Sequence, residues 1–173
     1  MTKKKGIKIL NKAVTKELAN FGIKKAICGD EYSYDYDKKV VTFKESENGI
    51  EDKWFTEFVK ERFNYVVRYP FIISLLHEIG HNKANDDVVG EVYDFCLAEK
   101  ERIMYETLAT DDENEMKKLS WQYFNLPDEI MATKWAVDYA RKHPKKIKKM
   151  WKKTRKALLE FYAKNGFIAE LMK

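Results

Sequence analysis

The chain has 173 residues, of which 45% are hydrophobic and 35% are charged, and its formal net charge at pH 7 is +5. This balance excludes a disordered or fibrous protein and predicts one compact domain with a highly charged surface, and the features that follow favour the cytoplasm. No run approaches the roughly 20 apolar residues that span a bilayer, and the first residues lack the apolar stretch of a secretory signal. The two cysteines form no CxxC pair, so neither a disulfide framework nor a cysteine metal site is expected.

The first part of the chain predicts one helix followed by a small antiparallel sheet. Apolar residues within 7–21 recur every three or four positions, which is typical of an amphipathic helix, and Gly22 ends it. Residues 25–28 are a short strand candidate, and the alternation of side chains within 32–43 predicts a β-hairpin.

The remainder of the chain predicts helices only. Pro70 suits a first helical turn, where its missing N–H needs no partner, so the helix that follows runs unbroken. Pro144 ends the last helix but one. The expected helices span residues 51–67, 71–84, 88–109, 116–124, 129–141 and 145–164. The fold class is therefore α+β and mostly helical.

The motif HEIGH, residues 77–81, lies within the helix that Pro70 opens. Histidines four positions apart lie on one face of a helix, so His77 and His81 can offer two imidazole nitrogens to one metal ion. The Glu78 carboxylate, next to the first histidine, is placed to accept a proton from a metal-bound water. This HExxH arrangement predicts a zinc peptidase, with Zn²⁺ as its cofactor and Glu78 as its general base.

A catalytic zinc normally takes three protein ligands, so one ligand has to come from outside the motif. Glu129 begins a helix in which alanines follow three and seven positions later, which favours close packing against the histidine helix. Asp87 stands where the extended HExxHxxGxxH/D pattern of metzincins has its third ligand, but that pattern has glycine where this chain has Ala84. Glu129 is the preferred third ligand, and Asp87 is the alternative.

The HEIGH motif together with LPDEIMATKWA, residues 126–136, resembles the ImmA/IrrE-type zinc metallopeptidases. This is a gluzincin-like family of bacteria and of their phages and other mobile elements, and the resemblance covers roughly residues 32–139. It implies a zincin-like domain, here residues 1–144, in which the small sheet packs near the HExxH helix. It also implies hydrolysis of a cytosolic protein substrate, for which a regulator such as a repressor is plausible.

On the family pattern, His77, His81 and Glu129 bind zinc and Glu78 is the general base. Thr133 stands where the family commonly has Asp or Asn, and its hydroxyl is expected to form a hydrogen bond with a ligand.

Such a reaction also needs a donor that stabilises the oxyanion of the tetrahedral intermediate. The candidates are Tyr123, Tyr139 and His143, and the sequence leaves this role open.

Charge is unevenly distributed along the chain. Residues 141–156 hold ten Lys or Arg and no acid, which predicts that residues 145–173 form a basic amphipathic helix packed on the same domain. Its lysines could face solvent, bind the acidic stretch of the same chain, or contact nucleic acid, an anionic membrane or an acidic partner. The second hypothesis is therefore a nucleic-acid- or partner-binding module in which the metal site is structural or degenerate.

Overall fold

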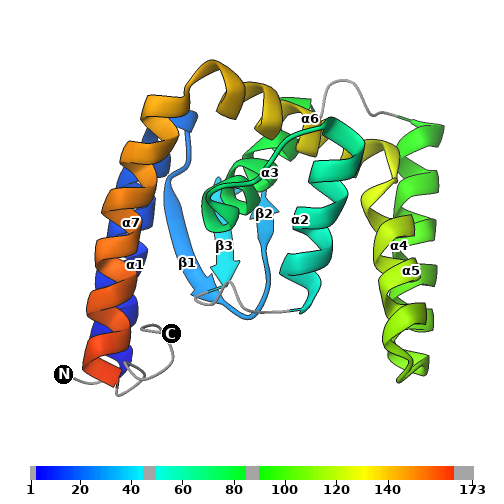
Figure 1. Cartoon of the computed structure of the whole chain (residues 1–173), viewed down its shortest axis with the longest axis horizontal. Coiled ribbons are helices and arrows are strands. Elements are labelled where there is room, and N and C mark those ends of the chain that lie inside the picture. The colour runs from blue at the N-terminus through cyan, green and yellow to red at the C-terminus, as the bar shows by residue number, and fades with distance from the viewer. Residues whose placement is uncertain (1–2, 45–49, 85–89, 166–173) are drawn as a thin grey trace. The chain divides into compact units, whose positions relative to one another are not determined.

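The computed structural model describes residues 3–44, 50–84 and 90–165, which are mostly helical and include one small sheet (Figure 1). This confirms the α+β class. The chain divides into two compact units, Met1–Glu45 with His143–Lys173, and Ser46–Lys142. The C-terminal helix groups with the N-terminal elements.

The first unit contains the sheet and two long helices. Helix α1 (Lys3–Leu18) buries Leu10, Val14 and Leu18 completely, at the four-residue spacing of one helical face. Gly22, at φ +86°, adopts the left-handed conformation that ends the segment. The elements are α1 (Lys3–Leu18), the 3₁₀ turn η1 (Ala19–Phe21), β1 (Lys25–Gly29), β2 (Ser33–Asp35), β3 (Val40–Lys44) and α7 (Pro144–Asn165).

The sheet is mixed rather than antiparallel, which corrects the expectation from the sequence. The predicted hairpin is present, with Tyr34 of β2 opposite Val41 of β3 in antiparallel register. However, β3 lies between the other two strands and pairs in parallel with β1, Ala26 opposite Val41. The chain reverses after β1 and again after β2, so β1 and β3 run in the same direction, and their pairing is necessarily parallel.

Helix α1 supplies hydrogen-bond partners for β1. The backbone N–H of Ala26 donates to Thr15 Oγ1 at 2.8 Å, and the N–H of Cys28 donates to Asn11 Oδ1 at 2.8 Å. These two side chains satisfy backbone donors of an edge strand, which would otherwise be open to pairing with another chain.

Helix α7 packs beside α1 (Figure 1). It has a buried apolar stripe and an exposed basic face. Ile147, Met150 and Phe161 are buried. Lys153 forms an ion pair with Glu17 of α1 at 2.6 Å. The other side chains of the basic face that are exposed include Lys145, Lys148, Lys149 and Lys152.

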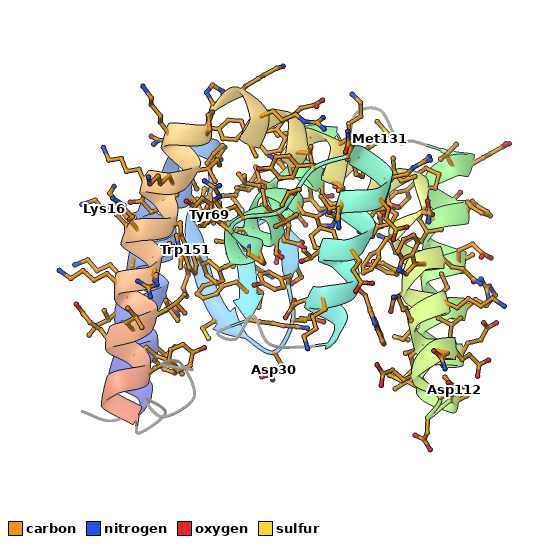
Figure 2. All side chains as sticks on the ribbon, in the orientation of Figure 1. Lys16, Asp30, Tyr69, Asp112, Met131 and Trp151 are labelled. Carbon is orange, nitrogen blue, oxygen red and sulfur yellow. The ribbon has the colours of Figure 1, made fainter. Side chains whose placement is uncertain are left out.

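The described part of the second unit contains five helices: α2 (Ile50–Phe63), α3 (Pro70–Ala84), α4 (Glu91–Ala109), α5 (Glu113–Phe124) and α6 (Pro127–Lys142). Phe58 of α2 and Val137 of α6 are at the centre of one buried cluster. Cys96 of α4 and Leu119 of α5 belong to another. Met131, labelled in Figure 2, packs against this second cluster. Asp112, labelled in Figure 2, begins α5, where its side chain accepts a hydrogen bond from the N–H of Asn114. Among the described residues, no helix has both the length and the hydrophobicity needed to cross a membrane.

Candidate functional site

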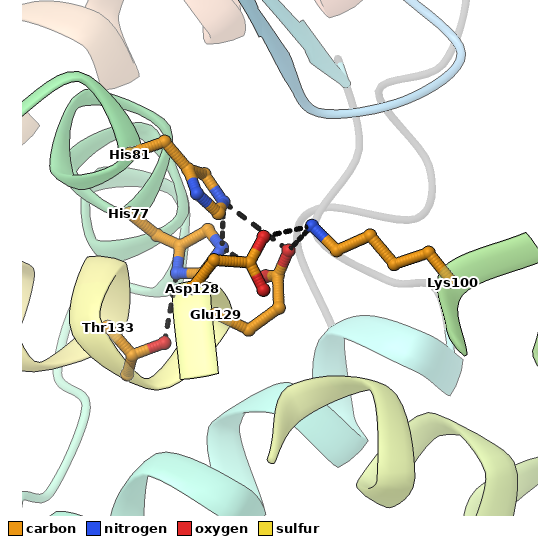
Figure 3. Close-up of polar contacts among 6 residues, drawn as sticks. All are labelled: His77, His81, Lys100, Asp128, Glu129 and Thr133. Carbon is orange, nitrogen blue, oxygen red and sulfur yellow. Dashed lines mark hydrogen bonds and ion pairs between the residues drawn. The ribbon is translucent and has the colours of Figure 1, made fainter. Parts of the chain in front are cut away.

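Helix α3 presents both histidines of the motif on one face. The helix begins at Pro70, as expected, and its apolar first half is buried. One turn separates His77 from His81, and their Nε2 atoms are 3.2 Å apart (Figure 3). His77 is only 7% exposed, and His81 is partly buried. The local helical geometry alone therefore brings two metal-ligand nitrogens together.

Glu129, in the first turn of α6, completes the group. Its Oε2 lies 2.9 Å from His77 Nε2, and its Oε1 lies 3.5 Å from His81 Nε2 (Figure 3). The three side chains each offer one ligand atom, all within 4.8 Å of one another, so the group could hold a metal ion. The structure thus brings together the three ligands preferred from the sequence. The alternative ligand, Asp87, lies outside the described residues.

Gly80, the small residue of the HEIGH motif, allows α6 to approach α3 this closely. A Cβ atom built on Gly80 would lie 2.3 Å from the carbonyl oxygen of Ala132 and 2.8 Å from its Cα. Contacts under 3.0 Å are essentially never seen for a real Cβ, so any larger residue would push the two helices apart. Glu129 and Thr133 flank this contact on α6, and the close packing brings both within reach of the histidines.

Thr133 holds the first histidine by its other ring nitrogen. Its Oγ1 lies 2.9 Å from His77 Nδ1, and the threonine is 1% exposed (Figure 3). When Nδ1 carries the proton and donates it to the hydroxyl oxygen, Nε2 keeps a free lone pair that points toward Glu129 and His81. The structure therefore has the hydrogen-bond contact predicted for Thr133. Through this contact with Nδ1, Thr133 orients the His77 ring so that Nε2 can act as a ligand.

The contacts within the group shift the pKa values of Glu129 and His81 in opposite directions. Burial raises the pKa of Glu129, but its hydrogen bonds with His77 and His81 outweigh this and hold that pKa well below its ordinary value. Burial lowers the pKa of His81, and its contact with Glu129 reverses this, so that the pKa is raised. The ionised carboxylate and the histidines therefore stabilise each other in a site that is almost closed to solvent.

Glu78, the expected general base, is beside this group but not part of it. The residue is 7% exposed. Burial raises the pKa of its carboxyl group, and the charges of His77 and His81 partly oppose that rise. A carboxyl group with a raised pKa, next to possible metal ligands, is well suited to exchange protons near neutral pH.

Two residues at the site were not expected from the sequence. Lys100 of α4 places its Nζ 2.5 Å from Asp128 Oδ2 and 2.5 Å from Glu129 Oε1 (Figure 3). Burial lowers the pKa of Lys100, but the Glu129 and Asp128 carboxylates raise it above its ordinary value. No motif around Lys100 predicts a role at the site. The one sequence feature that could have pointed to this contact is the position of Asp128 directly before Glu129.

The structure places one of the three candidate oxyanion donors at the site. The Tyr123 ring lies 5.3 Å from Lys100 Nζ. Burial raises the pKa of its hydroxyl, and the nearby Glu129 carboxylate raises it further. Tyr139 stacks on Trp135 with a centroid distance of 5.3 Å. His143 belongs to the first unit.

A scan against models of known protein families, a search of curated proteins and a search of solved structures each found no match. The family resemblance therefore stays a prediction from the motifs. The functional argument depends on the arrangement of the side chains described above.

Proposed function

We propose that this protein is a zinc-dependent metallopeptidase that hydrolyses a peptide bond in a cytoplasmic protein or peptide. The observation that carries the proposal is the convergence of His77, His81 and Glu129, whose ligand atoms lie within 4.8 Å of one another. A second buried acid, Glu78, lies beside them and has a raised pKa. Perturbed ionisable groups gathered in this way mark candidate functional sites.

The donor set suits zinc. Two imidazole nitrogens and one glutamate oxygen are the protein ligands of catalytic zinc in several peptidases, and they leave the fourth position open. Zinc bound there would polarise the scissile carbonyl and lower the pKa of a water molecule to about 7.

Residues of the chain account for the remaining roles in the reaction. Glu78 would accept a proton from the attacking water and pass it to the leaving nitrogen. Thr133 fixes the His77 ring through the 2.9 Å contact with Nδ1. Tyr123 is the preferred donor for the developing oxyanion, because burial and the site carboxylates keep its hydroxyl protonated by raising its pKa.

The resemblance to ImmA/IrrE-type peptidases supports the same reaction and extends the proposal to the substrate. On that basis, the substrate is a regulatory protein such as a repressor. The long interval between His81 and Glu129 is accommodated by α4 and α5, which come between the two ligand helices in the chain.

The first test measures zinc per chain by elemental analysis in folded protein. We expect about one zinc in the wild type, loss of zinc in His77→Ala and Glu129→Ala, and retention in His143→Ala. His143 is the matched control, because it is the one histidine of the chain outside the motif. Loss of zinc in Asp87→Ala, with retention in Glu129→Ala, would assign the third ligand to Asp87.

The second test separates metal binding from hydrolysis. Proteins from cells that produce the wild type or Glu78→Gln are compared by mass spectrometry of newly formed N-termini. We expect new termini only with the wild type, while both proteins bind zinc equally. Equal sets of termini would contradict the role of Glu78 and with it the peptidase proposal.

The exposed basic face of α7 favours a second candidate, a nucleic-acid-binding module in which the metal site is structural. Its lysines are exposed while its apolar stripe is buried, so the charges are available to phosphates. DNA binding that weakens steeply with salt, together with an unchanged cellular effect of Glu78→Gln, would support this candidate over the peptidase.

A further inference from the structure

Lys100 is the one cation from α4 that reaches the candidate metal ligands in the described part of the chain. Its ammonium contacts one oxygen of Glu129, Oε1, at 2.5 Å. The other oxygen, Oε2, faces His77 Nε2 at 2.9 Å. Oε1 also lies 3.5 Å from His81 Nε2. Both oxygens of this buried carboxylate thus have partners, and together these partners fix the rotation of the carboxylate plane.

Asp128 anchors this lysine. Its Oδ2 lies 2.5 Å from Lys100 Nζ, so the ammonium bridges two consecutive carboxylates at the start of α6. The side chains of Lys100 and Asp128 are 24% and 17% exposed, which protects the contact from screening by solvent. The charge of Asp128 also offsets that of Lys100, so the pair adds little net positive charge where a cation would bind.

We propose that Lys100, held by Asp128, is a positioning residue for the third metal ligand. It binds Glu129 Oε1 and leaves Oε2 directed toward His77 Nε2. This inference rests on the proposed metal site, and it assigns a part in metal binding to α4, a helix outside the HExxH motif and outside the third-ligand helix. Partners of this kind typically change metal affinity by about 10- to 100-fold when removed.

Competition between Lys100 and the metal ion would change metal affinity in the opposite direction. If Lys100 instead competed with the metal for Glu129, its removal would free the carboxylate and strengthen metal binding. The sign of the change in affinity therefore decides between positioning and competition.

The test measures Zn²⁺ and Co²⁺ affinity by competition with a chelator, in the wild type, Lys100→Met and Asp128→Asn. Lys117→Met is the matched control, because Lys117 also forms an ion pair, with Glu57 at 2.7 Å, but on an exposed surface. We expect affinity to fall by about 10- to 100-fold in Lys100→Met, less in Asp128→Asn, and not at all in Lys117→Met. The visible spectrum of bound Co²⁺ should change in Lys100→Met, since the orientation of a ligand changes.

Thermal unfolding in chelator separates positioning from general stabilisation. A purely structural role would lower the unfolding temperature of Lys100→Met while the folded protein kept its metal affinity and Co²⁺ spectrum, and that result would overturn the proposal. Tighter metal binding would also overturn it. Asp128→Asn keeps the lysine and serves as the test if Lys100→Met does not fold. A wild type that binds no metal would refute the proposed function itself, which is a different result from normal binding in both variants.

Discussion

Replacement of Gly80 by alanine tests whether the α3–α6 contact limits the geometry of the site. The added Cβ would lie 2.3 Å from the backbone carbonyl oxygen of Ala132, where real contacts are essentially never under 3.0 Å. The helices would have to separate by about 0.7 Å, the difference between those two distances. The atoms in conflict belong to the backbone of Ala132, so no change of side-chain rotamer relieves the contact.

Two opposing effects determine the change in the free energy of unfolding. Alanine favours a helix over glycine by about 1 kcal/mol. Overpacking costs roughly 1–3 kcal/mol, and a conflict with rigid backbone belongs at the upper end of that range. We therefore expect Gly80→Ala to lower the free energy of unfolding by about 2 kcal/mol. Metal affinity should fall too, because metal sites tolerate errors in ligand distance of only about 0.2 Å.

The assay is urea unfolding in chelator, together with metal competition on the folded protein. Lys83→Ala is the control, since Lys83 is exposed on the same helix. Adding Ala132→Gly to Gly80→Ala should not restore stability, because the methyl group of Ala132 is not among the nearest contacts. A Gly80→Ala protein as stable as the wild type, with unchanged metal affinity, would refute the reasoning.

Three further predictions concern the surroundings of the ligands. Thr133→Val removes the partner of His77 Nδ1 and should weaken metal binding by about 10- to 100-fold, with Thr133→Ser close to the wild type, as measured by chelator competition. Tyr123→Phe should lower kcat by about 100-fold or more while zinc content stays constant, and an unchanged kcat would exclude Tyr123 as the oxyanion donor. In chelator, the raised pKa of His81 stabilises the folded protein fully below the ordinary value of 6.5, and this contribution is lost as pH rises through the raised pKa. Unfolding at a series of pH values should show that loss, and Glu129→Gln should reduce it.

Short-range sequence patterns predicted the helices and the position of the two histidines on one helical face. The periodicity of apolar residues predicted the helices, and the structure has α3 from Pro70 and α6 from Pro127, within a few residues of expectation. The spacing of His77 and His81 fixed their juxtaposition, because a helix repeats every 3.6 residues. Glu129 was predicted as the third ligand because alanines follow it three and seven positions later and because of the family resemblance.

Tertiary structure decided what depends on residues far apart in the chain. The parallel pairing of β1 with β3 follows from the insertion of β3 between the other strands, and no property of a single strand specifies that order. The contact of Gly80 with the backbone of Ala132 joins two helices whose sequences show only that both residues are small. Lys100 looks like any lysine on an amphipathic helix until α4 packs and brings it to Asp128 and Glu129. Local spacing determines which side chains share a face, but only the packing of helices determines which faces meet.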